Sequence, residues 1–368
     1  MSINRFLLRT IRFDDKRTRP DRIKYDKLAP IREYIDSFIE NCKNGYSMSA
    51  YVTIDEKLEG FRGRYSFRQY IPSKPSKYEI KMFALCDARM FYTSNIEVYV
   101  GKQPDGPYDK SNSPGAIVER LCEQIYNTGR NLTLDNWFTS TDLVNSLLTK
   151  KITVVGTMRK NKKELPIEFS QPTRREVQSS IFGFNETCTI VSYVPKKNKN
   201  VVLVSSMHRE DNSIDNESGK SDIIMTYNST KGGVDTVDQL CANYNCARNS
   251  KRWPMVVFYA TLNIAGINSF VVYLSNNSNC SIRRRPFLQK LAMNLIEPHL
   301  RERAYLQNLP STIKIRIREI CNLEPAVQGA QVGQDKGRCA YCDTKKNRKT
   351  RYKCKKCQQF MCLEHITV

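Results

Sequence analysis

The sequence is poor in acidic residues relative to basic ones, and it holds a single long apolar run. Its 368 residues include 37 Asp and Glu against 59 Lys and Arg, so the formal net charge is +22. A positive excess of this size repels itself, which makes polyanions the natural partners. We expect nucleic acid rather than an anionic membrane surface, and the length allows two or three domains with cores of their own.

We see no pattern of a secretory signal peptide in the first residues of the sequence. The first 13 residues are apolar and carry arginine, but Asp14 and Asp15 follow at once, so we expect no transit peptide either. The long apolar run, 254–274, contains polar residues such as Asn263, and there is no second run of this kind. We therefore predict a helix buried on all sides in a soluble core, and no membrane partner.

Cysteines are unevenly distributed along the chain. Of the 13, eight are scattered and five crowd into the last thirty residues. Such clustering argues for a metal site in a reducing compartment rather than a secreted disulfide framework. In the tail, ligand residues recur in pairs separated by two residues, a spacing at which both side chains can bind one tetrahedral zinc ion. The pairs are Cys339 with Cys342, Cys354 with Cys357, and Cys362 with His365.

A cross-brace arrangement would place the first and third pairs on one Zn²⁺ ion. Cys354 and Cys357 would then need a further pair, but the sequence ends at Val368. Either their site is half-built or another chain completes it. The basic residues between 345 and 356 suit nucleic-acid contact or nuclear import. A cross-brace module is also suited to binding a protein or chromatin.

Three aspartates in separate contexts are candidates for a catalytic metal site. Asp55 and Asp135 each follow a strand-like alternation that turns the aliphatic side chains away from the carboxylate. Asp235 opens a helix, and Asp238 lies on the same side of it. Two strand carboxylates and one helix carboxylate can converge on hard divalent cations. Taken singly, each aspartate is better explained by turn or capping preferences, and only the three together point to a metal site.

The predicted order of elements is three strands, helix, strand, helix, strand. The strands are the run ending at Asp55, 78–86, 91–100, the run carrying Asp135, and 152–157, with helices at 114–129 and 140–148. This is the order of a ribonuclease-H-like domain, a mixed α/β fold. In that fold the first and fourth strands lie side by side, which would bring Asp55 and Asp135 together. The resemblance supplies this adjacency, because periodicity cannot pair strands.

Residues 158–229 interrupt this layout and are predicted to be β-rich. The predicted strands are Ser180–Phe184, Cys188–Val194, Val201–Met207 and Asp222–Tyr227. Basic turns between them are usually solvated loops, but on a chain of this charge they could also follow a phosphate backbone. Further helices are expected at 233–247, with Tyr244 on the buried face, at 254–274 and at 284–306.

Aromatic and basic residues interleave in the segment Phe61–Arg68. Such a segment could stack on and contact DNA, or it could be a half-buried hairpin whose arginine ends reach water. Trp137 and Trp253 are expected to pack rather than to stack on bases, with Trp137 close to the metal site.

Several long motifs in a fixed order resemble the piggyBac transposases, DNA cut-and-paste enzymes with a ribonuclease-H-like, retroviral-integrase-like core. The motifs are TIDEKLEGFRGR (53–64), YIPSKPSKY (70–78), DNWFTS (135–140), VVGTMR (154–159), TKGGVDTVDQ (230–239) and RWPM (252–255), together with the cysteine tail. The similarity runs over nearly the whole chain. It departs at the two ends, because family members usually carry a longer N-terminal extension and one more Cys pair in the tail.

The resemblance implies that Asp55, Asp135 and Asp235 form a catalytic triad that binds Mg²⁺ or Mn²⁺, with Asp238 as a fourth acidic position. It also implies a domain organisation. The helical dimerisation and DNA-binding parts are 1–45 and 254–323, the catalytic core is 46–157 and 230–253, the insertion is 158–229, the linker is 324–337, and the zinc-binding domain is 338–368.

The function implied is a two-metal DNA transposase of the DDD type. It would act in the nucleus as a homodimer, cleave element ends in double-stranded DNA and transfer them into TTAA targets. The alternative is a domesticated or fragmentary DNA-binding protein without transposition. The residues that we expect to contact DNA are Arg62, Arg64, Arg68, Lys74, Lys77, Arg159, Lys160, Lys162, Lys163, Arg248, Lys251 and Arg252.

Overall fold

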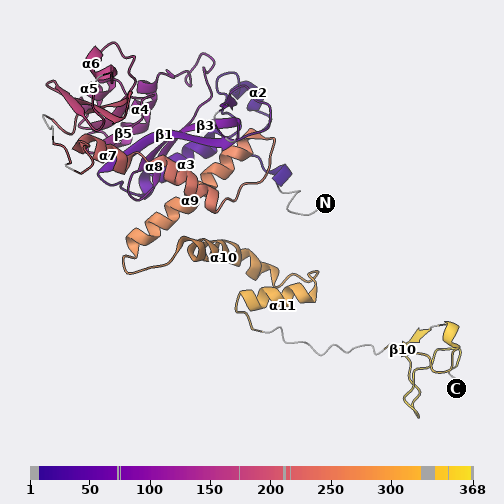
Figure 1. Cartoon of the computed structure of the whole chain (residues 1–368). Helices are drawn as coiled ribbons and strands as arrows, with labels where there is room; N and C mark the ends of the chain where they lie inside the picture. The colour runs from indigo at the N-terminus through magenta and orange to yellow at the C-terminus, as the bar shows by residue number, and fades with distance from the viewer. Residues whose placement is uncertain are drawn as a thin grey trace. The chain divides into compact units, whose positions relative to one another are not determined.

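The computed structural model describes residues 8–365 apart from 73, 75, 174, 210–212, 216, 325–335, 347 and the side chain of 344. The chain divides into two units, Met1–Leu288 and Gln289–Val368, which are described separately (Figure 1). Most of the predicted linker, 324–337, lies outside the described residues, as do the first seven residues of the chain.

One mixed sheet forms the centre of the first unit (Figure 1). Over the described residues its nine strands are β1 (Tyr51–Gly60), β2 (Gln69–Tyr70), β3 (Tyr78–Asp87), β4 (Thr93–Val98), β5 (Asn131–Leu134), β6 (Thr153–Met158), β7 (Ser180–Phe184), β8 (Thr189–Lys196) and β9 (Lys199–Ser205). The order across the sheet is β2-β3-β1-β5-β6-β9-β8-β7, and β4 pairs with β3. Strands β1, β5 and β6 are parallel to one another, whereas the other described pairings are antiparallel.

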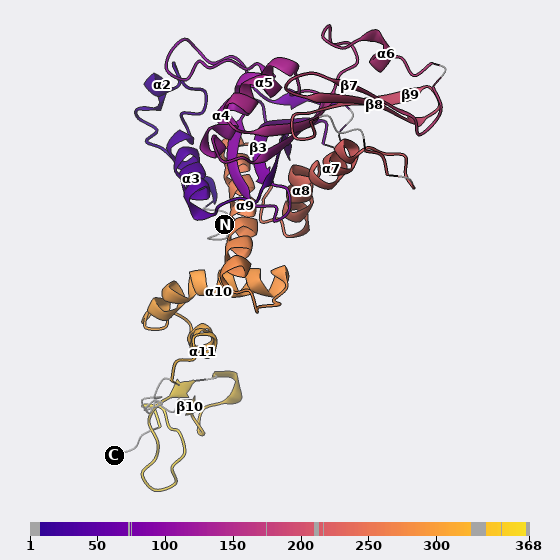
Figure 2. The same cartoon turned by 90° about the vertical axis from the view of Figure 1, so that its left-hand side faces the viewer.

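Helices pack on both faces of this sheet (Figure 2). The helices of the first unit are α2 (Arg19–Arg22), α3 (Arg32–Gly45), α4 (Pro114–Cys122), α5 (Thr141–Thr149), α6 (Ile167–Ser170), α7 (Asp222–Thr230), α8 (Gly233–Asn243) and α9 (Trp253–Asn276), with a 3₁₀ turn η1 (Glu123–Ile125). Helices α4 and α5 cover one face, while α7, α8 and α9 cover the other.

Alternation along β1 decides which side chains each layer buries. Val52 and Ile54 have no exposed surface and belong to the cluster formed with α4 and α5. Thr53 faces the opposite layer, where its hydroxyl donates to the carbonyl of Thr230 at 2.7 Å. Each fully buried aliphatic side chain contributes about 1.5–3 kcal/mol, and a slip of one residue would expose the set. The predicted alternation is confirmed.

The predicted order of strands and helices in the core is also confirmed. Strands β1 and β5 pair in parallel with Ile54 opposite Leu134. Asp55 on β1 and Asp135, the residue directly after β5, therefore follow this pair at matching positions. The first strand does not end at Asp55 as predicted, because β1 continues along β3 to Gly60.

The predicted strand at Asp222–Tyr227 is wrong, because these residues form the first part of helix α7. Their β-branched and aromatic composition favours a strand locally, but packing decides the outcome. Ile223 and Ile224 are buried, and Tyr227 packs against the same cluster beneath the sheet. The spacing of these three residues suits one face of a helix. Tyr244, predicted to be buried, is 45% exposed because α8 ends before it.

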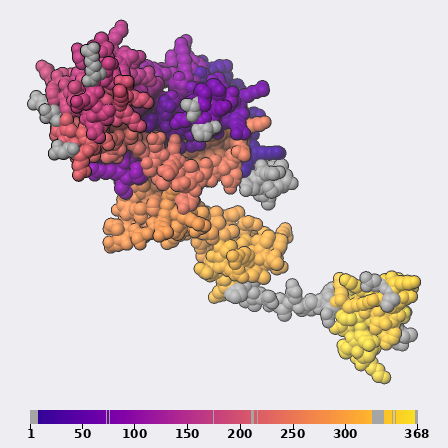
Figure 3. Space-filling model, in the orientation of Figure 1, coloured from indigo at the N-terminus to yellow at the C-terminus, as the bar shows by residue number. Residues whose placement is uncertain are grey.

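The three strands of the 158–229 region extend the core sheet. Strand β9 pairs antiparallel with β6, from Val155 opposite Ser205 to Met158 opposite Val202. Strands β8 and β7 follow outwards from β9. Figure 3 shows these magenta residues continuous with the purple residues of the core.

Helix α9 is, among the described residues, the one helix long and apolar enough to cross a membrane by length and composition. Of its apolar window, 56% is buried in the structure. Its Asn268 side chain accepts a hydrogen bond from the Thr93 N–H at 2.9 Å and donates to the Thr93 carbonyl at 2.8 Å. This burial and these contacts support a core helix, but the prediction that it is buried on all sides is wrong, because Leu262 is 40% exposed.

The second unit contains most of α10 (Arg284–Arg303), all of α11 (Ser311–Ile320) and the cysteine-rich tail. Ala304, Ile317 and Cys321 form a small core between the two helices. In the tail, β10 (Gly337–Arg338) pairs antiparallel with β11 (Lys349–Thr350), and a 3₁₀ turn η2 (Thr344–Lys346) lies between them in sequence.

Candidate active site and zinc site

The end of helix α7 and the start of helix α8 are held against the strands that lead to the two aspartates. The Thr53 hydroxyl on β1 donates to the carbonyl of Thr230, and the Thr133 hydroxyl on β5 lies 2.7 Å from the hydroxyl of the same threonine. Gly233 lies so close to β1 that a Cβ there would be 3.1 Å from the Thr53 side chain. These contacts act two residues before Asp55 and Asp135, and they bring Asp235 to the same end of the sheet.

The three carboxylates share one electrostatic environment. Burial raises the pKa of Asp55 to about 7, and the charges of Asp135 and Asp235 add to the rise. A carboxylate whose negative charge is unfavourable is stabilised by a bound cation. Mg²⁺ and Mn²⁺ prefer oxygen ligands, and Mg²⁺ commonly uses one or two carboxylates together with water and substrate oxygens. The carboxylates are therefore of the ligand type that a hard divalent cation prefers, but they are not gathered into a compact ligand group as the tail residues are.

Asp135 is held by the turn that follows β5. The backbone N–H of Trp137 donates to the Asp135 carboxylate at 2.8 Å, and the Thr139 hydroxyl donates to the Asp135 carbonyl at 2.8 Å. The Trp137 ring stacks on Phe83, with centroids 5.4 Å apart and planes 11° apart. Trp137 thus packs beside the aspartate, as predicted.

Asp238 is paired with a lysine that the sequence reasoning did not single out. Lys57 follows Asp55 by two residues on β1 and is only 1% exposed. Its ammonium group lies 2.6 Å from Asp238 and 3.0 Å from Glu59. Burial lowers the pKa of Lys57, but the two carboxylates outweigh burial, so its pKa is raised. The fourth acidic residue is therefore engaged in an ion pair one helical turn beyond Asp235.

Tyr227 is a second residue near the site that the sequence reasoning missed. Burial raises the pKa of its phenol, a hydrogen bond with Thr157 opposes the rise, and the charges of Asp135, Asp55 and Asp235 add to it. The phenol therefore lies in the field of all three aspartates. The sequence pattern predicts that Tyr227 lies on a strand, and for that reason this residue was not placed near the aspartates. The residue lies beneath the core sheet because it is part of helix α7.

The tail gathers the first and third ligand pairs, as the cross-brace interpretation predicts. The ligand atoms of Cys339, Cys342, Cys362 and His365 all lie within 4.8 Å of one another. The Nδ1 atom of His365 is 3.7 Å, 3.6 Å and 3.2 Å from the sulfurs of Cys339, Cys342 and Cys362. A tetrahedral Zn²⁺ ion with bonds of about 2.0–2.3 Å separates its ligands by about 3.5–3.8 Å. The donor set and its spacing fit Zn²⁺.

The middle pair lies outside this four-ligand group. Cys354 is half-buried and Cys357 is exposed. The backbone N–H groups of Cys357 and Lys356 lower the pKa of the Cys354 thiol. Over the described residues, no third or fourth ligand is gathered with this pair.

The segment Phe61–Arg68 takes the half-buried arrangement. Phe61 and Phe67 are 1% and 2% exposed, so both rings pack in the core. Arg62 and Arg64 are exposed, as are Lys74 and Lys77 in the turn that follows β2. Arg68 is half-buried, donates to the Gly63 carbonyl at 2.8 Å and lies over the Tyr78 ring.

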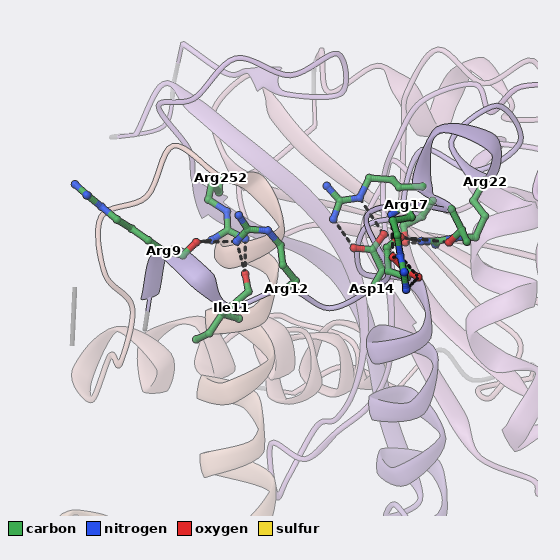
Figure 4. A network of polar contacts seen from close by, with 11 residues as sticks. Arg9, Ile11, Arg12, Asp14, Arg17, Arg22 and Arg252 are labelled. Atoms are coloured by element: carbon green, nitrogen blue, oxygen red, sulfur yellow. Dashed lines mark hydrogen bonds and ion pairs between the residues drawn. The ribbon is translucent and has the colours of Figure 1, made fainter. Parts of the chain in front are cut away.

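The other predicted DNA-contacting residues fall into two groups. Arg159 follows β6 and reaches Asn136, next to Asp135, at 3.4 Å. Around it Lys160 and Lys163 are exposed and Lys162 is half-buried. Before α9, Arg248 and Lys251 are exposed, whereas Arg252 donates to the carbonyls of Leu8 and Ile11 (Figure 4).

Comparison with known proteins gives consistent matches. A family model described as Transposase IS4 matches residues 1–270. A cryo-EM structure of the piggyBac transposase synaptic complex with hairpin DNA matches with a TM-score of 0.82 at 40% sequence identity, covering 98% of this chain and 77% of that one. The human PiggyBac transposable element-derived protein 3 and the human Chimeric ERCC6-PGBD3 protein are each 22% identical over 259 residues, or 62% of this chain. The chain spans only 41% and 23% of these two human proteins.

The fold defines a mixed α/β protein with a ribonuclease-H-like core. Within that class, the chain belongs to the piggyBac transposase family. The predicted fold class and family are confirmed.

Proposed function

We propose that this chain is a DDD-type DNA transposase that cleaves the ends of a DNA element and joins them to target DNA. The observation that carries the proposal is the pairing of β1 with β5, which puts Asp55 and Asp135 at matching positions, together with the charges of Asp135 and Asp235 acting on Asp55. The 40% identity to a transposase solved in a complex with hairpin DNA supports DNA as the substrate. The net charge of +22 suits a polyanionic substrate.

The three aspartates are positioned by different elements, and we propose that all three bind the catalytic metal ions. Asp55 is on β1, Asp135 directly follows the adjacent parallel strand β5, and Asp235 is presented by α8. Together they would hold two Mg²⁺ or Mn²⁺ ions, which when bound activate the attacking hydroxyl and stabilise the leaving oxygen. Asp238, which contacts Lys57, would act by fixing the first turns of α8 rather than by binding metal.

The test is DNA nicking by single Asp→Asn variants of the triad. Supercoiled plasmid that carries element ends bordered by TTAA is incubated with the full chain and Mg²⁺, and nicked product is measured over time. D55N, D135N and D235N should each slow nicking by about 100-fold or more, since metal-held charge stabilisation is worth several kcal/mol. The matched control is D142N, at an exposed position in the first turn of α5, which should nick like the wild type.

The result distinguishes the two candidate functions. A triad variant that nicks at the wild-type rate overturns the assignment of the site. A wild-type chain that binds the plasmid but does not nick it with Mg²⁺ or Mn²⁺ is instead a DNA-binding protein without transposition.

The remaining expectations are part of the same proposal. Zn²⁺ would be held by Cys339, Cys342, Cys362 and His365, with Cys354 and Cys357 in a second site. The chain would act in the nucleus as a homodimer, and the tail would contact DNA, chromatin or a protein. TTAA targets rest on family resemblance.

A further inference from the structure

A cationic pocket lies apart from the three aspartates in the first unit. It has a volume of about 380 Å³ and is lined by residues from the N-terminal segment, the loop after β1 and the start of α9. Six of its lining residues are basic: Arg12, Lys16, Arg19, Arg64, Lys251 and Arg252. None of the described residues that line it is acidic. The N-terminal three were not among the residues predicted to contact DNA.

Most of this positive charge is uncompensated. Among the described residues, no carboxylate forms an ion pair with Lys16, Arg64 or Lys251, and all three are exposed. Arg19 is paired with Asp14, which is shared with Arg22. Like charges gathered in this way repel one another and lower the stability of the fold unless an anion enters.

The effect of this crowding is visible at Arg252. Burial lowers the pKa of its guanidinium, and the charges of Arg12 and Arg19 lower it further. The guanidinium donates to the carbonyl of Ile11 at 2.6 Å and to that of Leu8 at 3.1 Å (Figure 4). Arg252 therefore holds the N-terminal segment against the start of α9.

Other contacts fix the pocket walls before any ligand arrives. The Phe13 ring packs on Phe258 and Tyr34, with centroid distances of 5.0 Å and 5.4 Å. Gly63 lies so close to the Lys251 carbonyl that a Cβ would be 2.6 Å from it, which brings the Arg64 loop onto the α9 start. A pre-formed site loses little ordering entropy when it binds.

The aromatic residues of the pocket favour a phosphate over a base. Trp253 is 5% exposed, and its ring is occupied by Tyr65 at 5.1 Å and Phe67 at 5.0 Å. Base stacking needs an open ring face, and this ring is committed to the core. Guanidinium and ammonium groups, by contrast, are the usual donors to phosphate oxygens.

We infer that this pocket binds a phosphate of the DNA backbone, with Arg12, Lys16, Arg64 and Lys251 at its mouth and Arg19 and Arg252 in its wall. The inference rests on the proposed DNA-processing function and assigns a second contact to the same substrate, at residues other than the triad. Its role is to position the duplex without reading its sequence.

The test compares two double variants of the full chain. K16Q/K251Q removes two pocket charges that have no ion-pair partner among the described residues. The control, R17Q/K24Q, removes two charges from the same N-terminal segment at exposed side chains outside the pocket. Affinity for two 30-base-pair duplexes of unrelated sequence, each with one TTAA, is measured between about 50 and 200 mM salt.

The pocket variant should bind both duplexes more weakly, and the slope of log affinity against log salt should fall by about 0.9 for each phosphate that is no longer bound. The control should keep a slope close to that of the wild type. Thermal unfolding without DNA should be unchanged or shifted upwards for the pocket variant, because repulsion is relieved, which separates weaker binding from misfolding.

Each other result is decisive as well. An equal decrease in affinity for the two double variants would show a general field effect and overturn the pocket. A decrease on only one duplex would show base readout and overturn the phosphate assignment. Failure of the wild type to bind either duplex would contradict the proposed function itself.

Discussion

Asp55 is expected to lower the stability of the metal-free protein, although it is one of the proposed metal ligands. Its pKa is raised from 3.8 to about 7 by burial and by its acidic neighbours. A carboxyl group with a raised pKa favours folding when protonated, and that contribution is lost as pH rises from about 4 through 7. At pH 8, D55N should therefore increase the free energy of unfolding by about 2 kcal/mol in EDTA.

The same variant should lose the response to metal. Adding Mg²⁺ should raise the midpoint of thermal unfolding of the wild type, because the cation binds the folded state, and D55N should show little or no rise. A D55N chain that is less stable than the wild type in EDTA, or is stabilised equally by Mg²⁺, would contradict this account.

Lys57 supports the site from behind through a buried ion pair. K57M should destabilise the protein by about 2 kcal/mol in urea unfolding, because Asp238 and Glu59 lose their cation while remaining partly buried. D238N should cost less, since Lys57 keeps Glu59. The opposite order of the two variants would show that the pair does not hold α8 in place.

The three aspartates could be predicted from the sequence, whereas the ion pair between Lys57 and Asp238 could not. Asp55 and Asp135 stand out because each ends a run of alternating aliphatics, and the family motif completes the set. Lys57 follows the same alternation but resembles any lysine on a strand until α8 is packed on β1. Burial by a distant helix is a tertiary property, which local periodicity does not contain.

Strand β6 and the turn after β5 approach each other closely at Gly156. A Cβ there would be 2.5 Å from the Thr139 hydroxyl and 3.1 Å from the Leu134 carbonyl. G156A should therefore destabilise the protein by about 1–3 kcal/mol and lower nicking, because Thr139 holds the turn of Asp135.

A double-mutant cycle tests this cause. T139A removes the hydroxyl that a Cβ at position 156 would clash with. The double variant G156A/T139A should therefore lose less stability than the sum of the two single changes. Strict additivity in urea unfolding would mean that the strain lies elsewhere.

Elements with strong periodicity were predictable, and those governed by distant packing were not. The parallel pair β1 and β5 and the apolar helix α9 follow from their patterns and from the resemblance. Helix α7 does not, because Ile223, Ile224 and Tyr227 suit a strand until they are packed under β6, β8 and β9. The sheet extension through β9 has the same origin, since no local signal shows which core strand it joins.

Function in the whole chain depends on segments far apart in sequence. The triad joins β1, β5 and α8, and the cationic pocket joins the N-terminal segment, the loop after β1 and the start of α9. Both lie within the first unit. DNA held at the pocket and cut at the triad would contact one pre-formed body. Among the described residues, the tail differs in that its gathered ligand set comes from one short stretch of sequence, Cys339 to His365.

The tail should therefore depend on Zn²⁺ for its fold. Its described strands are only two residues long, and a structural zinc site contributes about 10–16 kcal/mol in small zinc domains. Chelation should make residues 336–365 sensitive to protease. The unfolding midpoint of the first unit should stay unchanged, because its core contains none of these ligands.

C342S should lose the bound zinc measured by mass spectrometry of the native chain, because it removes one of four gathered ligands. C357S is the matched control: it lies outside that group and should retain this zinc ion and the protease resistance of Cys339 to His365. Equal zinc loss in the two variants would show that the middle pair belongs to the same site and would overturn the four-ligand assignment.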